Sequence, residues 1–338
     1  MKNTPVCIGS GLIALDVIYD NTKTSPSFLA GGSCGNVLTI LSYLGWESYP
    51  IARLGDDLEG DRILEDMKKW GVKTKFIEQE DGTDSPRIIE RIFRGKTPKH
   101  RFYLKCDHGN WLPRRKPFLL KTLGNIQNKI PRANVFYFDR ATPSAYNIAK
   151  NLKNKNTIIV FEPPKFLHDN VFYDCLKIAD IVKHCYSQAQ DTEKSRINIP
   201  LEIQTKSEEG LQYKATFLKN KEWKPLPAVP VHSLVDAAGS GDWLTAGMIY
   251  MLRMYKSVYD IPVKKLEHTL NFGQALASLN CNYIGARGMM YHISKDKLIK
   301  LANKVCIDKK IQIIVKTDRR IHVNSKLASQ CKVCLCAN

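Results

Sequence analysis

The sequence predicts an α/β fold in which helices cover both faces of a mainly parallel β-sheet. Apolar runs of strand length recur along the chain, and stretches with helical spacing alternate with several of them. Strands that are apolar throughout are typical of parallel strands buried on both faces. A third observation concerns 86–105, where two strand-like runs flank a turn-rich GKTPK with no helix between them. These two runs predict an antiparallel hairpin.

The expected elements follow in chain order. Strand-like runs lie at 6–19, 48–55, 87–93, 100–106, 134–139, 156–163, 179–184 and 201–210. Helical stretches lie at 36–46, 58–71, 143–154 and from Thr245 onward. The first run could be mistaken for a signal peptide, but Asp16 interrupts it, and Gly9 and Gly11 suit a strand-to-turn junction. We therefore expect a buried first strand and a cytoplasmic protein.

Composition limits the class of protein. The 338 residues are 43% hydrophobic and 25% charged, which is ordinary for a globular chain. No apolar stretch reaches the about 18 residues of a membrane span. Neither a repeat nor a linker divides the chain, so we expect a single domain over 1–338 with a cysteine-containing tail at 320–338.

A net charge of +18 favours anionic ligands. The densest basic and aromatic region, 93–116, could bind a nucleic acid backbone, but it is also typical of an exposed hairpin with charged outer faces. We expect the hairpin and no nucleic-acid partner.

The C-terminal CKVCLC contains half of a possible zinc site, Cys331 and Cys334. Cys106 and His108 could supply the other half. The alternative is a reduced tail in a reducing compartment, and we expect no bound zinc.

The stretch VDAAGSGDWLTAG, residues 235–247, carries the most chemistry. A helix N-terminus has unpaired N–H groups and partial positive charge, and glycines let an anion approach closely. Gly239, Ser240 and Gly241 could hold phosphate oxygens while Asp242 takes a proton from an attacking hydroxyl. The alternative is a helix cap with a glycine turn.

Further motifs accompany this stretch in a particular order. GGSCGN (31–36), LGWESYPIARLGDDLEGDRILEDMKKWGV (44–72), TKSEEG (205–210), DAAGSGD (236–242) and NFGQALASLNCNYIGARG (271–288) closely resemble the ribokinase-like (PfkB) family of sugar and nucleoside kinases, to about residue 300. The resemblance implies a ribokinase-like fold with a small β-sheet lid from segments about 12–31 and 84–108. It also implies transfer of the γ-phosphate of ATP, with Mg²⁺, to a hydroxymethyl group of a sugar or nucleoside.

The resemblance also implies roles for individual residues. Asp242 matches the catalytic base, and the amides of 239–241 match the anion hole. Substrate-binding positions are matched by Asp16, Gly32, Ser33, Asn36 and, on the lid, Arg87. Nucleotide-binding positions are matched by Thr205, Ser207, Gly210 and Gln274. Asp236 matches a position that is linked to a monovalent cation, such as K⁺, in some members.

This chain departs from the family pattern mainly on the nucleotide side. Cys185 stands at the Asn of the Asn-x-x-Glu segment that helps to organise magnesium, and Ser187 or Gln188 stands at its acidic region. Ser207 replaces a glycine, Gln274 an asparagine, and Ser33 a residue that is basic in many sugar kinases. A non-catalytic sugar- or nucleotide-binding regulator on the same fold is therefore the alternative function.

The lid raises two further expectations. Arg87 or Arg91 could face the pocket, or both could face solvent. The lid could also mediate a homodimer.

Overall fold

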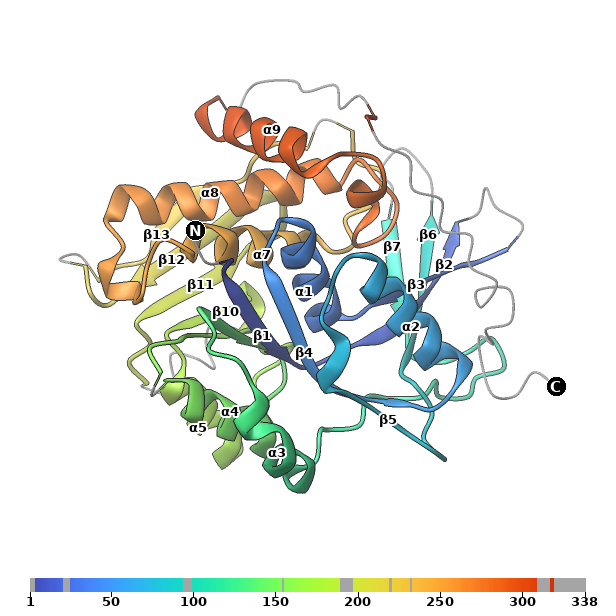
Figure 1. Ribbon diagram of the computed structural model, residues 1–338. Helices are drawn as coiled ribbons and strands as arrows, with labels where there is room; N and C mark the ends of the chain where they lie inside the picture. The colour runs from blue at the N-terminus through green and yellow to red at the C-terminus, as the bar shows by residue number, and fades with distance from the viewer. Residues whose placement is uncertain are drawn as a thin grey trace.

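A large sheet forms the centre of the computed structural model (Figure 1). The structure describes residues 4–20, 25–93, 99–153, 155–188, 197–218, 221–231, 233–308 and 317–318. Within these residues the sheet has nine strands. Their spatial order is β13 (Lys224–Pro227), β12 (Gly210–Ala215), β11 (Leu201–Thr205), β10 (Ile181–Cys185), β9 (Ile158–Phe161), β8 (Val135–Phe138), β1 (Val6–Ser10), β4 (Glu47–Gly55) and β5 (Ile77–Glu80). All pairs from β11 to β5 are parallel, whereas β12 and β13 pair antiparallel. The predicted mainly parallel sheet is confirmed.

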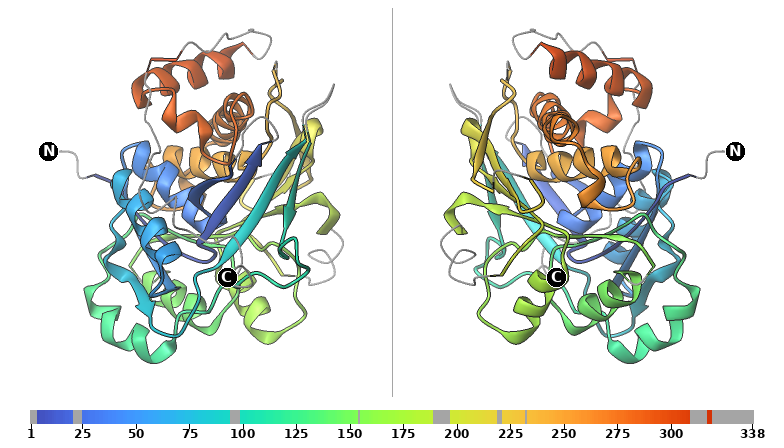
Figure 2. Two further views of the ribbon diagram at one scale, coloured as in Figure 1. Left: turned by 90° about the vertical axis from the view of Figure 1, so that its right-hand side faces the viewer. Right: turned by 90° about the vertical axis from the view of Figure 1, so that its left-hand side faces the viewer.

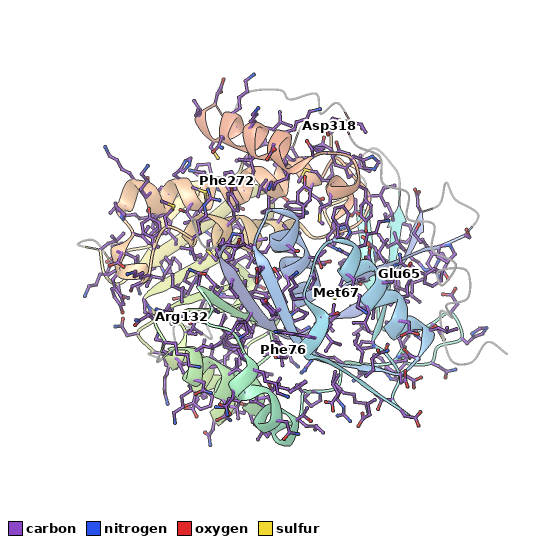
Figure 3. The ribbon with its side chains drawn as sticks, in the orientation of Figure 1. Glu65, Met67, Phe76, Arg132, Phe272 and Asp318 are labelled. Carbon is purple, nitrogen blue, oxygen red and sulfur yellow. The ribbon has the colours of Figure 1, made fainter. Side chains whose placement is uncertain are left out.

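Alternate residues of the central strands enter two hydrophobic clusters, one on each face of the sheet. In β8, Val135 and Tyr137 belong to the first cluster and Phe136 and Phe138 to the second. This division follows from the period of two in a strand, and it explains why these runs are apolar throughout. Figure 3 labels Phe272 in the first cluster and Phe76 in the second.

Helices supply the other side of each cluster. The first contains residues of α1 (Ser33–Tyr43), α2 (Leu58–Lys69), α7 (Ser240–Leu252), α8 (Val263–Asn280) and α9 (Lys295–Ile307). The second contains residues of α3 (Leu120–Ile126), α4 (Pro143–Lys153) and α5 (Asn170–Ile178). None of the described helices combines the length and the apolar composition that crossing a membrane requires.

A second, smaller sheet lies beside this body, at the right of Figure 1 and toward the viewer in the left view of Figure 2. Its described strands lie in the order β3 (Ser27–Gly31), β2 (Ala14–Asp20), β6 (Arg87–Phe93) and β7 (Lys99–Tyr103). The predicted hairpin is confirmed, because β6 and β7 pair antiparallel. These strands come from both segments expected to form a lid, and a role in closing the site stays a prediction.

The first apolar run divides between the two sheets. Its first part is β1 of the large sheet, and its second part is β2 of the small sheet. At Gly11, between them, a Cβ would lie 1.8 Å from an Asp139 carboxylate oxygen, so the turn requires a glycine. Of the two glycines expected at the junction, Gly11 is the point where the chain leaves the body for the small sheet, whereas Gly9 lies within β1.

Candidate active site

The opening turn of α7 requires a glycine. Gly239 is the N-cap of α7 and has a φ of 72°, in the left-handed region that favours glycine. A Cβ there would lie 2.3 Å from the carbonyl oxygen of Ala286. Because glycine has no Cβ, the 285–286 turn can pack directly against the start of the helix.

This turn also provides positive charge. The Ser240 N–H donates to Ala237 O at 3.2 Å, while helix geometry leaves the N–H groups of Gly241 and Asp242 without an acceptor in the helix. A Cβ on Gly241 would lie 3.7 Å from Lys183 Nζ, so an ammonium group lies beside the helix end. Amide groups, helix dipole and ammonium together suit an anionic ligand.

The Asp242 carboxylate is held by a residue from a distant part of the chain. Asn36, which is buried in α1, donates from Nδ2 to Asp242 Oδ2 at 2.7 Å. Burial and the negative charge of Glu162 raise the pKa of Asp242, and the Asn36 hydrogen bond and Lys183 partly offset them. A desolvated carboxylate in this setting is a stronger base than one in water.

Glu162 and Lys183 are site residues that the sequence interpretation did not identify. Glu162 directly follows β9 and forms an ion pair with Lys183 of β10. It also accepts hydrogen bonds from Thr245 Oγ1 at 2.6 Å and from Tyr137 OH at 3.3 Å. The available signal was a charged residue at the end of an apolar strand, since the carboxyl ends of parallel strands meet at one edge.

Asp139, at the end of β8, also lies at this edge. It accepts from the N–H groups of Leu12 at 2.9 Å and Cys34 at 3.2 Å, and it pairs with Arg140 at 3.3 Å. Burial raises the pKa of this carboxyl, and the arginine and backbone donors oppose the effect. Asp139 thus joins the turn after β1 to the start of α1.

Asp16 meets α1 at Gly32. The Asp16 carboxylate accepts a hydrogen bond from the Gly32 backbone, and the N–H of Asn36 donates to Gly32 O at 2.8 Å. At Gly31 a Cβ would lie 1.8 Å from Asp16 Oδ2, so this close approach requires a glycine. Ser33 is the first residue of α1. The structure therefore connects Asp16, Gly32 and Asn36 with Asp242.

The Asp16 carboxyl is strongly desolvated. Burial raises its pKa to about 7, the charge of Asp66 adds to the effect, and Arg287 opposes it. Arg287 is itself paired with Asp66 at 2.7 Å. Of the Asp16 and Asp66 carboxyls, Asp66 thus has the direct ion pair with Arg287, and the guanidinium offsets the burial of Asp16 only in part.

The expected nucleotide-binding residues lie at or near the edge of β10 and β11. Thr205 ends β11 and donates from Oγ1 to His184 O at 3.4 Å, which places it beside the end of β10. Ser207 has a φ of 51° and Gly210 a φ of 100°. A serine in the left-handed region stands where the family resemblance placed a glycine, so the backbone keeps the glycine conformation. Gln274 of α8 donates to Pro227 O at 3.3 Å.

The two arginines of β6 have partners within the protein. Arg87 is buried and contacts Glu59 at 3.0 Å and Asp57 at 3.9 Å. Arg91 pairs with Asp107 and lies over the Tyr19 ring. The alternative in which both arginines face solvent does not hold for Arg87. Its Nε and Nη1 atoms have no hydrogen-bond partner among the described residues, and substrate binding by Arg87 stays a prediction.

Asp236 lies in the loop before α7. Its carboxylate accepts from Ala238 N at 2.9 Å and Gly285 N at 2.7 Å, and it contacts His100 Nδ1 at 3.2 Å. A monovalent cation at Asp236 stays a prediction.

The other metal and partner expectations remain untested. Cys331, Cys334 and the tail 320–338 lie outside the described residues. Cys106 is buried and His108 exposed. Exposed apolar side chains on the lid hairpin and the loop that follows it would suit a dimer through the lid, namely Phe93, Phe102, Leu104 and Trp111.

Comparison with known proteins identifies the family of this chain. The chain matches the family model described as pfkB family carbohydrate kinase over residues 2–92 and 176–292, more than half of its length. It is 23% identical over 322 residues to a probable fructokinase-5 of Arabidopsis thaliana, which covers 85% of this chain and 94% of that relative.

Solved structures show the same fold. A ribokinase from Giardia lamblia superposes with a TM-score of 0.70 at 14% identity, and an uncharacterized sugar kinase from Pyrococcus horikoshii with 0.66 at 22%. Each alignment covers 89% of this chain and 99% of the other. The fold is therefore ribokinase-like, and the chain belongs to the PfkB family of carbohydrate kinases.

Proposed function

We propose that this protein transfers the γ-phosphate of ATP to a hydroxymethyl group of a sugar or nucleoside, with Asp242 as general base. The observation that carries the proposal is the Asp242 carboxylate in the first turn of α7, held by Asn36 at 2.7 Å beside a glycine N-cap. The family membership supports the reaction class. An ATP complex of the Pyrococcus sugar kinase and a ribose and ATP complex of an Arabidopsis thaliana ribokinase support the two substrates.

The acceptor would bind between the small sheet and α1. Asp16 would accept hydrogen bonds from sugar hydroxyls, and the buried Asn36 Oδ1 atom, which has no hydrogen-bond partner among the described residues, would accept another. An unpaired buried acceptor is costly, so a hydroxyl donor at this point gains more than an exposed contact would. These contacts would orient the hydroxymethyl group toward Asp242.

In the proposed reaction, the hydroxymethyl oxygen of the acceptor attacks the γ-phosphorus while Asp242 takes the proton from that oxygen. The bond from the γ-phosphorus to the ADP oxygen breaks. The amides of the α7 turn and the Lys183 ammonium would stabilise the charge on the transferred group. Ser207, Thr205, Gly210 and Gln274 would contact the nucleotide.

Magnesium fits the oxygen donors at this edge. Glu162 is a candidate ligand, since Mg²⁺ is bound by one or two carboxylates together with substrate phosphates and water. Its oxygens contact Lys183, Thr245 and Tyr137, and an ion would have to share them. Bound there, the ion would neutralise charge on the phosphates. A potassium ion is present in a Vibrio cholerae fructokinase complex with fructose and ADP, and we keep Asp236 as the candidate position for such an ion here.

The decisive test is Asp242→Asn. Removing the general base should lower the turnover number at least about 100-fold, whereas ATP affinity should change little because Asn keeps the shape. ADP formation would be measured over a panel of ketoses, aldoses and nucleosides, with ATP binding measured by calorimetry. Asp174→Asn, a partly exposed aspartate of α5, is the matched control and should keep full activity.

Near-normal turnover of the Asp242 variant would remove this residue from the mechanism. A non-catalytic regulator is the second candidate. It is favoured by Cys185, and by Ser187 or Gln188, in place of the magnesium-organising segment. It predicts that the wild-type protein binds a sugar or nucleotide and forms no ADP with any acceptor.

A further inference from the structure

Two strands of the small sheet bring a carboxyl and an imidazole to Asp236. In the β6–β7 hairpin, Ile92 lies opposite His100, and Glu90 lies two residues before Ile92. Because strand side chains alternate with a period of two, Glu90 and His100 share one face of the hairpin. The third member, Asp236, belongs to the loop before α7 in the large body of the protein.

The three side chains are close enough to share one ion. Each of the three side chains offers one ligand atom, and these three atoms all lie within 4.8 Å of one another. Among the described residues, no other group of three histidine, cysteine or acidic side chains meets this criterion. Glu90 is 1% exposed and Asp236 is 2% exposed, whereas 24% of the His100 side chain is exposed. The imidazole edge thus offers an entry path from solvent to two buried carboxyls.

A second observation points to a missing ligand. Glu90 Oε1 is buried and has no hydrogen-bond partner among the residues that the structure describes. Leaving a buried carboxyl oxygen unpaired is costly, and native proteins rarely do so. A cation bound by the cluster would give Glu90 Oε1 the partner that the described residues do not provide.

We propose that Glu90, His100 and Asp236 form a binding site for a divalent first-row transition ion such as Zn²⁺, which joins the small sheet to the loop before the catalytic helix. One imidazole nitrogen and two carboxylates are ligands that Zn²⁺ takes in proteins, with an open position for water. Magnesium and potassium prefer sites of oxygen ligands only, so the imidazole favours a transition ion here. A transition ion and the monovalent cation proposed at Asp236 would compete for that carboxylate.

The site has a mechanical consequence. Two of its ligands move with the hairpin, and the third is six residues before Asp242. An ion held by all three would fasten β6 and β7 to the turn that precedes the phosphate-binding amides. The site does not depend on the proposed kinase reaction, because its ligands and its test involve metal binding alone.

The test uses Co²⁺ as a spectroscopic substitute for Zn²⁺ on chelator-treated full-length protein. Thiolate-bound Co²⁺ shows an intense sulfur-to-metal absorption in the near ultraviolet, so cobalt held by cysteines is distinguished from cobalt held by nitrogen and oxygen. We expect one Co²⁺ per chain without thiolate absorption. Its affinity should fall at least tenfold in both Glu90→Gln and His100→Asn, because each variant removes one ligand.

The variants are chosen to preserve the fold, and their folding is checked directly. Glu90→Gln keeps the size of the side chain and can donate a hydrogen bond to Asp236. His168→Asn replaces an exposed histidine far along the chain and is the matched control. Circular dichroism and urea unfolding would verify that each variant is folded. The proposal is overturned if wild-type protein binds only thiolate-held Co²⁺, or if both variants bind Co²⁺ as tightly as the wild type and His168→Asn do.

Discussion

Replacing Asp16 with asparagine should make the protein more stable and its acceptor site weaker. The Asp16 carboxyl is 8% exposed, and burial raises its pKa to about 7 from an ordinary 3.8, with Arg287 as the main opposing charge. In the unfolded chain the same group ionises near pH 4. Ionising it in the folded protein is therefore unfavourable, and asparagine removes that cost.

The sign and size follow from proton linkage. Below about pH 4 the Asp16 carboxyl is neutral in both the folded and the unfolded chain, so it does not lower the unfolding free energy. Between about pH 4 and 7 only the unfolded chain loses its proton, so the wild type loses about 1.4 kcal/mol of unfolding free energy per pH unit from this group. Over the whole window the loss is about 4 kcal/mol, and above pH 7 it stays constant. Asparagine carries no such loss.

Urea unfolding at pH 5, 6, 7 and 8 measures the effect. The difference in unfolding free energy between Asp16→Asn and wild type should grow by about 2.3 kcal/mol between pH 5 and 7, in favour of the variant, and then level off. Asp174→Asn should differ from wild type by about 0.5 kcal/mol or less at every pH, because its side chain is partly exposed.

Acceptor binding should change in the opposite direction. A neutral amide loses charge-assisted hydrogen bonds to sugar hydroxyls, which are worth about 1.5–3 kcal/mol, so the dissociation constant of the acceptor should rise at least tenfold. This part rests on the proposed function, whereas the unfolding experiment does not. A destabilised variant at pH 8, or a stability difference that is flat with pH, would refute the burial argument for Asp16.

Two backbone predictions follow from the left-handed positions. Gly239→Ala should lower the unfolding free energy by about 2–4 kcal/mol, because a Cβ would lie 2.3 Å from Ala286 O and φ is 72°. Urea unfolding measures this loss, and an unchanged unfolding free energy would contradict the prediction. Ser207→Gly should raise the unfolding free energy by about 0.5 kcal/mol, since relief of a φ of 51° exceeds the entropic cost of glycine. A loss of about 1 kcal/mol in the same assay, typical of glycine at an ordinary φ, would show that Ser207 is not strained.

Local patterns in the sequence determined the class of fold and the position of the turn that opens α7. Continuous apolar runs such as 134–139 predicted buried parallel strands, because such strands are covered on both faces. The Gly-Ser-Gly-Asp stretch predicted a helix start with Asp242 in its first turn, and α7 begins there. These signals depend on near neighbours in the chain, which is why they could be read without a structure.

The partners of these residues were decided by the tertiary structure alone. Asn36 reaches Asp242 across 206 positions, and Glu162, which follows β9, meets Lys183 within the adjacent strand β10. Arg87 lies in a strand pattern that left its direction open, and only packing against Glu59 determined it. Likewise, nothing near Asp236 in the sequence indicates His100. Strand order and sheet packing bring such side chains together, and a period of two or 3.6 residues carries no information about which distant segments become neighbours.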